Sequence, residues 1–434
     1  MWLPVVERDD DSSTPPTPTP LRRERATAAL RHRDFRLLWM GEFVSTLGTQ
    51  MQTVALGWQL YLLTGDPLQL GILGLMRAIP TVTIAMVGGA LADARDRRSL
   101  LLITQTVLAL FSVVLAVATM TGQASVALIY ILTILTATAS CFDDPARQAL
   151  IPNLVPRERL AHATTLNILA HNIAAVVGPA VGGIAIATVG LSATYWLDAA
   201  SFAAVIGALL MMHSRPEVPV VTQGGVQAVL EGIRFVRKNP VILSLMTLDF
   251  LATLFGASLV LMPIFAQEIL KVGEGGLGLL YSAPAAGAVT GGIILSVLPV
   301  SHRPGRLVVA AVACYGFAIA IFGASDSFVV ALLALAASGA ADTVSMTFRH
   351  TIRQLATPDA MRGRMAAVHS VFSGGGPELG NFEAGVAARL FGTQTAVVAG
   401  GIGCIILAAA TALVAPQIRD YTVEEPEQRV GVEE

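Results

Sequence analysis

Charged side chains are scarce in this sequence. Aspartate, glutamate, lysine and arginine make up 13% of its 434 residues, whereas 54% are hydrophobic and the mean hydropathy is +0.67. Soluble domains contain about 25% charged residues, which cover their surface. The low share of charge therefore excludes a soluble protein of this length. It indicates a polytopic membrane protein that is embedded in the lipid bilayer.

Cysteine is also rare, and several chemical signatures are missing. The 3 cysteines, Cys141, Cys314 and Cys404, lie in separate apolar segments, so neither a disulfide framework nor a metal cluster is expected. The sequence lacks G-x-x-x-x-G-K-[ST], which excludes direct use of a nucleotide, and it lacks a nucleophile elbow and a zinc signature. A net charge of −2 provides no basic field for nucleic acid. We expect no enzyme activity, no metal and no cofactor.

Long apolar runs are abundant instead. A helix needs about 20 mostly apolar residues to cross a bilayer. The sequence predicts an all-α protein with twelve transmembrane helices, near 35–63, 70–92, 99–120, 125–149, 157–188, 194–213, 241–267, 276–298, 305–324, 327–350, 361–390 and 393–415. With both termini in the cytoplasm, nearly every arginine and lysine lies on the cytoplasmic side, the exceptions being Arg77, Lys271 and Arg389. Arginine-rich and alanine-rich composition is typical of a GC-rich bacterial genome, so we expect a multi-pass protein of a bacterial inner membrane.

The connections between the spans divide the chain. The proline-rich residues 1–34 and the acidic residues 416–434 are expected to be disordered cytoplasmic tails. The connection 214–240 contains VLEGIRFVRKNP, whose pattern predicts an amphipathic helix on the inner membrane surface. This connection separates an N-terminal six-helix bundle, 35–213, from a C-terminal six-helix bundle, 241–415.

The two halves are related as repeats. In four pairs of residues the second member follows the first by 202 positions: Arg147 and Arg349, Pro156 and Pro358, Gly178 and Gly380, Gly183 and Gly385. Near the start of each half, EFVSTL at 42–47 matches DFLATL at 249–254 with an offset of 207 positions. Parallel six-helix repeats are typical of transporters, in which the substrate binds between the halves near mid-membrane.

A charged loop, GGALADARDRRS at 88–99, follows the second predicted span. Gly89 and the glycine before it allow another helix to approach closely. Asp93 lies where it can face a helix N-terminus or an arginine, and Arg97 and Arg98 lie at the inner interface. A routine positive-inside loop would explain the arginines alone, but the G-x-x-x-D spacing favours a specific role.

This stretch resembles the signature loop of the major facilitator superfamily, with Ala94 and Asp96 in place of the usual basic residue and glycine. Three further segments are similar to the enterobactin-exporter-like branch, which also holds macrolide and tetracycline efflux pumps. They are FDDPARQALIPNLVPRERLAHATTLN at 142–167, EGIRFVRKNP at 231–240 and TPDAMRGRMAAVHSVF at 357–372. The resemblance implies the major facilitator fold and drug:proton antiport, and we expect a monomer.

The fifth predicted span contains GPAVGG within an apolar stretch. Gly178 and Gly182 belong to one row of small residues, and Pro179 and Gly183 to a second row beside it, so another helix can pack very closely. The stretch resembles the antiporter motif of proton-coupled drug exporters, which implies that it seals the interface between the halves and favours efflux. The matching segment of the second half, GNFEAG, lacks the proline. Tight packing without a transport role is the alternative.

Ionisable side chains inside the spans are costly and are therefore candidates for function. Glu42 and Asp249 occupy matching positions on the first and seventh spans, which line the central cavity in this superfamily. A carboxylate in a partly dry cavity can bind a proton outside and release it inside; hydrogen-bonded contacts between helices are the alternative.

Other ionisable residues inside the spans have different expected roles. Asp198, on the peripheral sixth span, and the lone histidines His171 and His369 are expected to be structural. Further candidates for proton coupling or for the substrate cavity are Asp342, Arg77, Glu378 and Glu383.

A charge network is expected at the cytoplasmic end of the fourth span. Asp143, Asp144 and Arg147 would join Asp93 and Arg97 there, and the network would hold an inner gate in one of its two states. A solvated cluster at the membrane interface, which contributes little energetically, is the alternative.

These features predict a proton-coupled secondary active exporter, an antiporter that moves a siderophore or a drug-like compound out of the cell by alternating access. A nutrient or metabolite importer of the same fold is the first alternative, and the glycine-proline motif disfavours it. A non-transporting receptor or scaffold is the second. The carboxylates inside the spans and the short outer loops disfavour that reading.

Overall fold

The computed structural model describes residues 26–84, 96–213, 226–297, 303–358 and 361–422 of the chain. Within these ranges the chain forms helices and their connections, and no strand occurs. The all-α class that the sequence predicts is confirmed. Two residues of the signature loop, Gly89 and Asp93, lie outside the described ranges, as do most of the two predicted tails.

The first half contains α1 (Arg33–Thr64), α2 (Pro67–Thr83), α4 (Arg97–Met120), α5 (Val126–Leu150) and α6 (Leu160–Met211). Short 3-10 turns precede α1 and link α5 to α6: Ala26–Arg31, Ile151–Asn153 and Arg157–Arg159. Gly190 kinks α6, with φ 84° and ψ 170°. Glycine tolerates this positive φ, so the predicted spans 157–188 and 194–213 follow one another at a kink rather than across an open loop.

The second half begins with α7 (Val226–Lys238) and α8 (Pro240–Phe255), followed by the short turns Leu259–Leu261, α9 (Met262–Ile264) and a π-helical turn at Phe265–Ile269. The long helices α10 (Gly273–Val297), α11 (Pro304–Ala324), α12 (Phe328–Ala356), α13 (Arg362–Phe391) and α14 (Thr393–Val414) come next, and α15 (Pro416–Arg419) ends the described chain. The helix α7 lies in the predicted connection 214–240 and is tied to α13, where Arg364 Nε lies 2.9 Å from Glu231 Oε2.

Polar caps and prolines set the starts of several helices. The Asp66 carboxylate accepts a hydrogen bond from Leu68 N at 3.0 Å, and Pro67 occupies the first turn of α2. Asn239 caps α8 in the same way, with Pro240 in its first turn. A side-chain oxygen before the helix satisfies an otherwise unpaired N–H, and proline at this position gives up no helical hydrogen bond.

Eight helical segments of the described chain are long and apolar enough to cross a membrane. They are α4, α5, α6, the segment from α8 to Ile269, α10, α11, α12 and α14. The kinked α6 covers two predicted spans. The other three long helices, α1, α2 and α13, are not among the eight; α1 and α13 carry several charged side chains, and α2 is described only as far as residue 84. The count of twelve spans and the cytoplasmic position of both termini therefore remain predictions.

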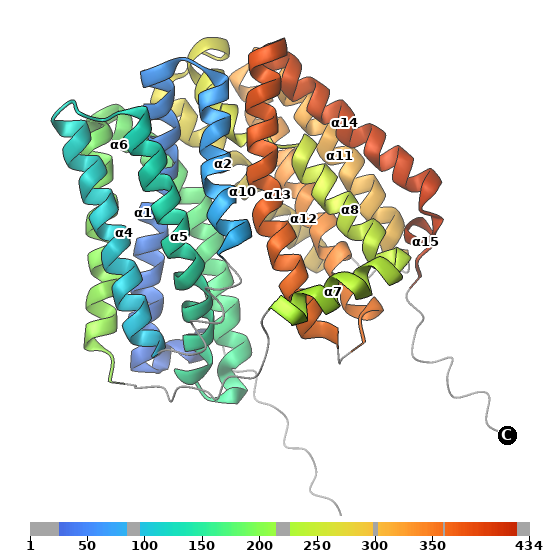
Figure 1. The fold of residues 1–434 in the computed structure, drawn as a ribbon, viewed down its shortest axis with the longest axis horizontal. Coiled ribbons are helices and arrows are strands. Elements are labelled where there is room, and N and C mark those ends of the chain that lie inside the picture. The colour runs from blue at the N-terminus through green and yellow to red at the C-terminus, as the bar shows by residue number, and fades with distance from the viewer. Residues whose placement is uncertain (1–25, 85–95, 214–225, 298–302, 359–360, 423–434) are drawn as a thin grey trace, which may run out of the picture.

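The helices form two groups that lie side by side (Figure 1). The first group, α1 to α6, is drawn in blue to green, and the second, α8 to α14, in yellow-green to red. Two helix pairs join the groups: α2 packs along α13, and α6 packs along α10. These four helices form most of the interface between the halves, and α1 adds contacts to α9 and α10.

The apolar cores differ between the two ends of the molecule. At the end where α1 finishes, which we call the joined end, one core combines residues of both halves, including Trp58, Leu70, Phe265 and Leu277. At the opposite end, where α1 begins, the cores are separate. One contains Phe35 and other residues of the first half, and two more contain residues of the second half alone. We call this the separate end.

Candidate functional site

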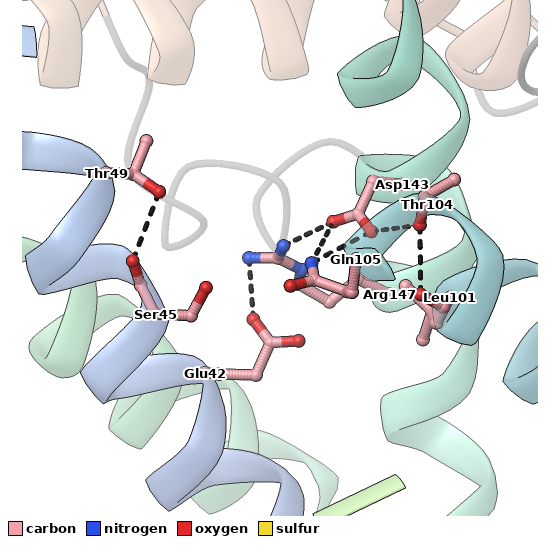
Figure 2. A network of polar contacts seen from close by, with 8 residues as sticks. All are labelled: Glu42, Ser45, Thr49, Leu101, Thr104, Gln105, Asp143 and Arg147. Carbon is pink, nitrogen blue, oxygen red and sulfur yellow. Dashed lines mark hydrogen bonds and ion pairs between the residues drawn. The ribbon is translucent and has the colours of Figure 1, made fainter. Parts of the chain in front are cut away.

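A network of buried polar contacts links α1, α4 and α5 in the first half (Figure 2). Arg147 Nη1 lies 2.6 Å from Glu42 Oε2, and Arg147 Nη2 donates to Asp143 Oδ2. Asp143 also accepts hydrogen bonds from Thr104 Oγ1 at 2.5 Å and from Gln105 Nε2 at 3.0 Å. Glu42 and Asp143 are 6% and 2% exposed. One arginine thus bridges two buried carboxylates that lie on different helices.

The second half contains an equivalent cluster. Arg349 Nη1 on α12 lies 2.9 Å from Asp249 Oδ1 on α8, and Arg349 Nη2 lies 3.6 Å from Asp342 Oδ1. Arg349 is the repeat partner of Arg147, and Asp249 is the repeat partner of Glu42. The sequence identified both relations, but not that each arginine pairs with the carboxylate of its own half. The constant offsets between the halves were the sequence signal from which this pairing could have been inferred.

A central cavity of about 570 Å³ lies between the first half and α13. Its charged lining residues are Arg77 on α2, Asp144 on α5 and Glu378 on α13, and hydroxyl and amide side chains such as Thr133 and Gln52 surround them. A side cavity of about 270 Å³ shares Asp144 and Gln52 with it. The predicted cavity residues Arg77 and Glu378 therefore face one space from opposite halves.

The second half has a cavity of its own, of about 620 Å³, lined by Asp249, Asp342 and Arg349. His369 also lines this cavity, and its Nδ1 lies 2.8 Å from Arg353 Nη1. Asp342 is 54% exposed toward this space.

Other candidates lie elsewhere. Glu383 lies on α13 but does not line these three cavities. His171 lines the side cavity beside Asp144. Asp198 is fully buried and contacts Ser112, which lines the same cavity. The sequence did not single out Ser112, although a serine inside an apolar run is a visible sign of a polar contact.

The arginines of the signature loop contact backbone carbonyls. Arg97 Nη1 donates to Ala149 O at 2.8 Å, and Arg98 Nη2 donates to Leu210 O at 3.1 Å. Both contacts stay within the first half. In the described residues Glu42, rather than Arg97, completes the network of Asp143 and Arg147, which differs from the expected arrangement. The part of that network that involves Asp93 lies outside the described residues.

The GPAVGG motif packs on two different helices. A Cβ atom on Gly178 would lie 2.6 Å from Gln50 Cβ of α1, and one on Gly182 would lie 2.9 Å from Met51 Cα. On the other face, a Cβ atom on Gly183 would lie 2.8 Å from the Cα of Gly278 on α10. Only glycine fits at these three positions without displacing a neighbour. One row of the motif therefore faces its own half and the other faces the second half.

Polar contacts also cross between the halves at the joined end. Arg389 on α13 pairs with Asp66, the N-cap residue of α2. Tyr61 Oη donates to Glu268 Oε1 at 2.9 Å. Arg389 was an exception to the predicted orientation of basic residues, and this ion pair gives it a partner.

The chain resembles known proteins over most of its length. The sequence model described as "Transmembrane secretion effector" matches residues 24–430. Enterobactin exporters EntS from Shigella boydii serotype 18 and from Escherichia coli are each 26% identical over 396 residues, which cover 91% of this chain and 95% of theirs.

Solved structures show the same fold. A bacterial homologue of the human lysosomal transporter Spinster has a TM-score of 0.71 at 14% identity and covers 91% of this chain and 99% of its own. A bacterial homologue of the iron transporter ferroportin has a TM-score of 0.64 at 16% identity and covers 87% of this chain and 99% of its own.

These similarities confirm several predictions. The relatives are transporters rather than enzymes, and their similarity extends over nearly the whole chain. The protein is an export transporter for a small molecule and a multi-pass protein of the inner membrane. The chain belongs to the transmembrane secretion effector family of the major facilitator superfamily.

Proposed function

We propose that the protein is a proton-coupled antiporter that exports a siderophore or a drug-like compound by alternating access. The observation that carries this proposal is the pair of repeat-related clusters, Glu42 with Arg147 and Asp249 with Arg349, placed at the cavities of the two halves. Carboxylates of this kind inside membrane-spanning helices are a recurring feature of proton relays.

Alternating access requires the halves to separate at one end while they stay in contact at the other. The shared apolar core, the Asp66–Arg389 pair and the Tyr61–Glu268 hydrogen bond support closure at the joined end. The separate cores support opening at the other end. If the termini are cytoplasmic, this arrangement is the inward-open state, with 35–213 and 241–415 as its two moving bodies.

Proton binding would act through the ion pairs. Glu42 Oε1 is buried and has no hydrogen-bond partner, while Oε2 contacts Arg147. A proton on this carboxyl group would remove the charge that holds Arg147, which would then keep Asp143 as its partner. The helices α1 and α5 would be released from one another at this point. Asp249 and Arg349 would behave in the same way between α8 and α12.

The central cavity supports a polar substrate with many hydrogen-bonding groups. Hydroxyl and amide side chains line it, including Thr49, Thr136 and Gln148, and Arg77 supplies a positive charge for an acidic group of the substrate. Enterobactin is the molecule named for the relatives that were compared. We include siderophores in the proposal for both reasons.

Export can be tested in cells and with purified protein. Deletion of the gene should raise the intracellular retention of a siderophore or of a toxic compound. Purified protein in liposomes should move that compound when a proton gradient is imposed, and dissipation of the gradient should stop the movement. Loss of nutrient uptake as the only transport defect would favour an importer. No transport of any compound under either condition would favour a receptor or scaffold.

A further inference from the structure

Asp198 is a buried carboxylate that no cation contacts in the part of the chain that the structure describes. Its side chain is 0% exposed, between α1, α4 and its own helix α6. Its Oδ2 lies 2.5 Å from Ser112 Oγ, and its Oδ1 has no hydrogen-bond partner. Glu42 and Asp249, in contrast, each contact an arginine.

A buried carboxylate without a counter-charge is costly in its ionised form, so such a group binds a proton instead. The backbone of α1 lies very close to the Asp198 carboxyl group, which adds to the cost of ionising it. A Cβ atom on Gly48 would lie 2.9 Å from Asp198 Oδ1 and 2.1 Å from Ser201 Oγ. The backbone of α1 therefore covers the carboxyl group closely and leaves no space for a larger polar residue at position 48.

The contacts of Ser112 fit a protonated carboxyl group. The serine hydroxyl has one hydrogen and two acceptor lone pairs. Gln52 Nε2 donates to Ser112 Oγ at 2.8 Å, and the hydroxyl lies 3.3 Å from Leu108 O as a possible acceptor. If Asp198 carries a proton on Oδ2, that O–H donates to Ser112 Oγ and the serine hydroxyl donates to Leu108 O, so both hydroxyl hydrogens have an acceptor.

The other charged and titratable side chains on the three surrounding helices have different contacts or positions. On α1, Glu42 pairs with Arg147, and Arg33, Asp34 and Arg36 lie at its start, about 18 Å or more along the helix from Gly48. On α4, Arg97 and Arg98 bind backbone carbonyls near its start. On α6, His162 and His171 precede the Gly190 kink, and the Tyr195 hydroxyl donates to Gln59 Oε1 at 2.8 Å.

A polar route connects Asp198 with the central cavity. Ser112 and Gln52 both line the side cavity, and Gln52 also lines the central cavity. A hydronium ion in the side cavity can give its proton to Ser112 Oγ and leave as water, while the hydroxyl passes its own hydrogen to Asp198 Oδ2. One O–H bond forms at each step as another breaks, and the reverse sequence returns the proton.

We propose that Asp198 is a proton-binding site of this transporter, reached from the side cavity through Ser112 and occupied in the state that the structure shows. This inference rests on the proposed proton coupling. It replaces the structural role that the sequence favoured for this residue. The site belongs to the first half alone, because Gly400 stands 202 positions after Asp198.

The test uses purified full-length protein in liposomes and the siderophore or drug that the wild type exports. Asp198→Asn keeps the volume of the side chain and resembles its protonated form. This variant should lose gradient-driven efflux and keep substrate counterflow. It should also lose the proton exchange that a pH-indicating dye reports for the wild type. Tyr195→Phe, which removes a buried hydroxyl one turn away, should keep all three.

The outcomes separate the two proposals. A wild type that a proton gradient does not drive would overturn the proposed coupling, and the site with it. A driven wild type with equally driven Asp198→Asn would overturn the site alone. If Asp198→Asn does not fold, Ser112→Ala provides the test. Slower gradient-driven efflux with intact counterflow would support proton transfer to Asp198 through Ser112, and driven efflux at the wild-type rate would contradict it.

Discussion

Arg147 Nη1 on α5 lies 2.6 Å from Glu42 Oε2 on α1. The second half repeats this relationship between Arg349 and Asp249, at 2.9 Å. In each half a carboxylate on the first long helix of the bundle meets an arginine on a later helix, and that arginine lines a cavity of the same half. Each ion pair holds two helices in one relative position. Binding of a proton to the carboxylate would weaken the pair and so affect the packing of the two helices.

Neutral variants of the paired carboxylates test their part in coupling. Glu42→Gln and Asp249→Asn, made singly, should lose gradient-driven efflux and retain substrate counterflow, because exchange requires no net proton movement. Both activities are measured in liposomes with the same substrate. If both persist in both variants, or both vanish together with folding, these carboxylates are not proton carriers.

Replacement of the bridging arginine tests whether its geometry matters. Arg147→Lys keeps the charge, but a compact ammonium group replaces the planar fork that contacts Glu42 and Asp143. We expect a loss of about 1–3 kcal/mol in stability from one missing charge-assisted hydrogen bond. Thermal unfolding in detergent measures this loss. Arg98→Lys, at a partly exposed carbonyl contact, is the control and should change stability by about 0.5 kcal/mol or less.

A methyl group at the half–half interface should prevent closure. In Gly183→Ala, the new Cβ would lie 2.6 Å from Glu274 O and 2.8 Å from Gly278 Cα, so α6 and α10 must move apart. We expect reduced efflux and greater labelling of cysteines introduced at the joined end. Gly207→Ala on the same helix is the control, since nothing lies within 4 Å of its Cβ position. Equal labelling of both variants would contradict a sealing role.

The ion pair between Asp66 and Arg389 should stabilise the joined end. Arg389→Gln removes one charge, and Asp66→Asn removes the other while it keeps a side chain able to cap α2. Each variant should increase opening at this end, and the double variant should add little to either single one, because both changes break the same pair. Cysteine accessibility gives the measurement. Additive effects in the double variant would show that the two residues act independently. Arg389 is 55% exposed, so the effect should weaken as salt concentration rises.

The signature loop offers a test of the predicted inner gate. Asp93→Asn should abolish turnover and leave expression and substrate binding largely intact, because the amide keeps the volume but loses charge-assisted hydrogen bonds. Asp96→Asn is the matched control, since Asp96 caps α4 through Ser99 N at 3.1 Å and asparagine caps equally well. Wild-type transport rates in the Asp93 variant would show that the loop only sets the membrane topology and does not act as a gate.

The membrane class and the division into repeats followed from the sequence alone. A helix in lipid must satisfy its own backbone groups and present apolar side chains, so long apolar runs and few charges determine the class without any knowledge of packing. Constant offsets identified Arg147 with Arg349 and Glu42 with Asp249 as equivalent positions. Equivalence between repeats is a property of the linear sequence.

Which residues are neighbours was decided only by the tertiary structure. Glu42 and Arg147 lie on different helices, and their contact depends on the rotation and height at which those helices pack, which no local pattern encodes. The environment of Asp198 was likewise decided by the tertiary structure, because its lack of a counter-charge depends on the packing of three helices. The small residues of GPAVGG predicted close packing from their spacing. Their partners, α1 on one face and α10 on the other, came from the arrangement of the halves, since a flat helix face accepts any backbone that the fold brings to it.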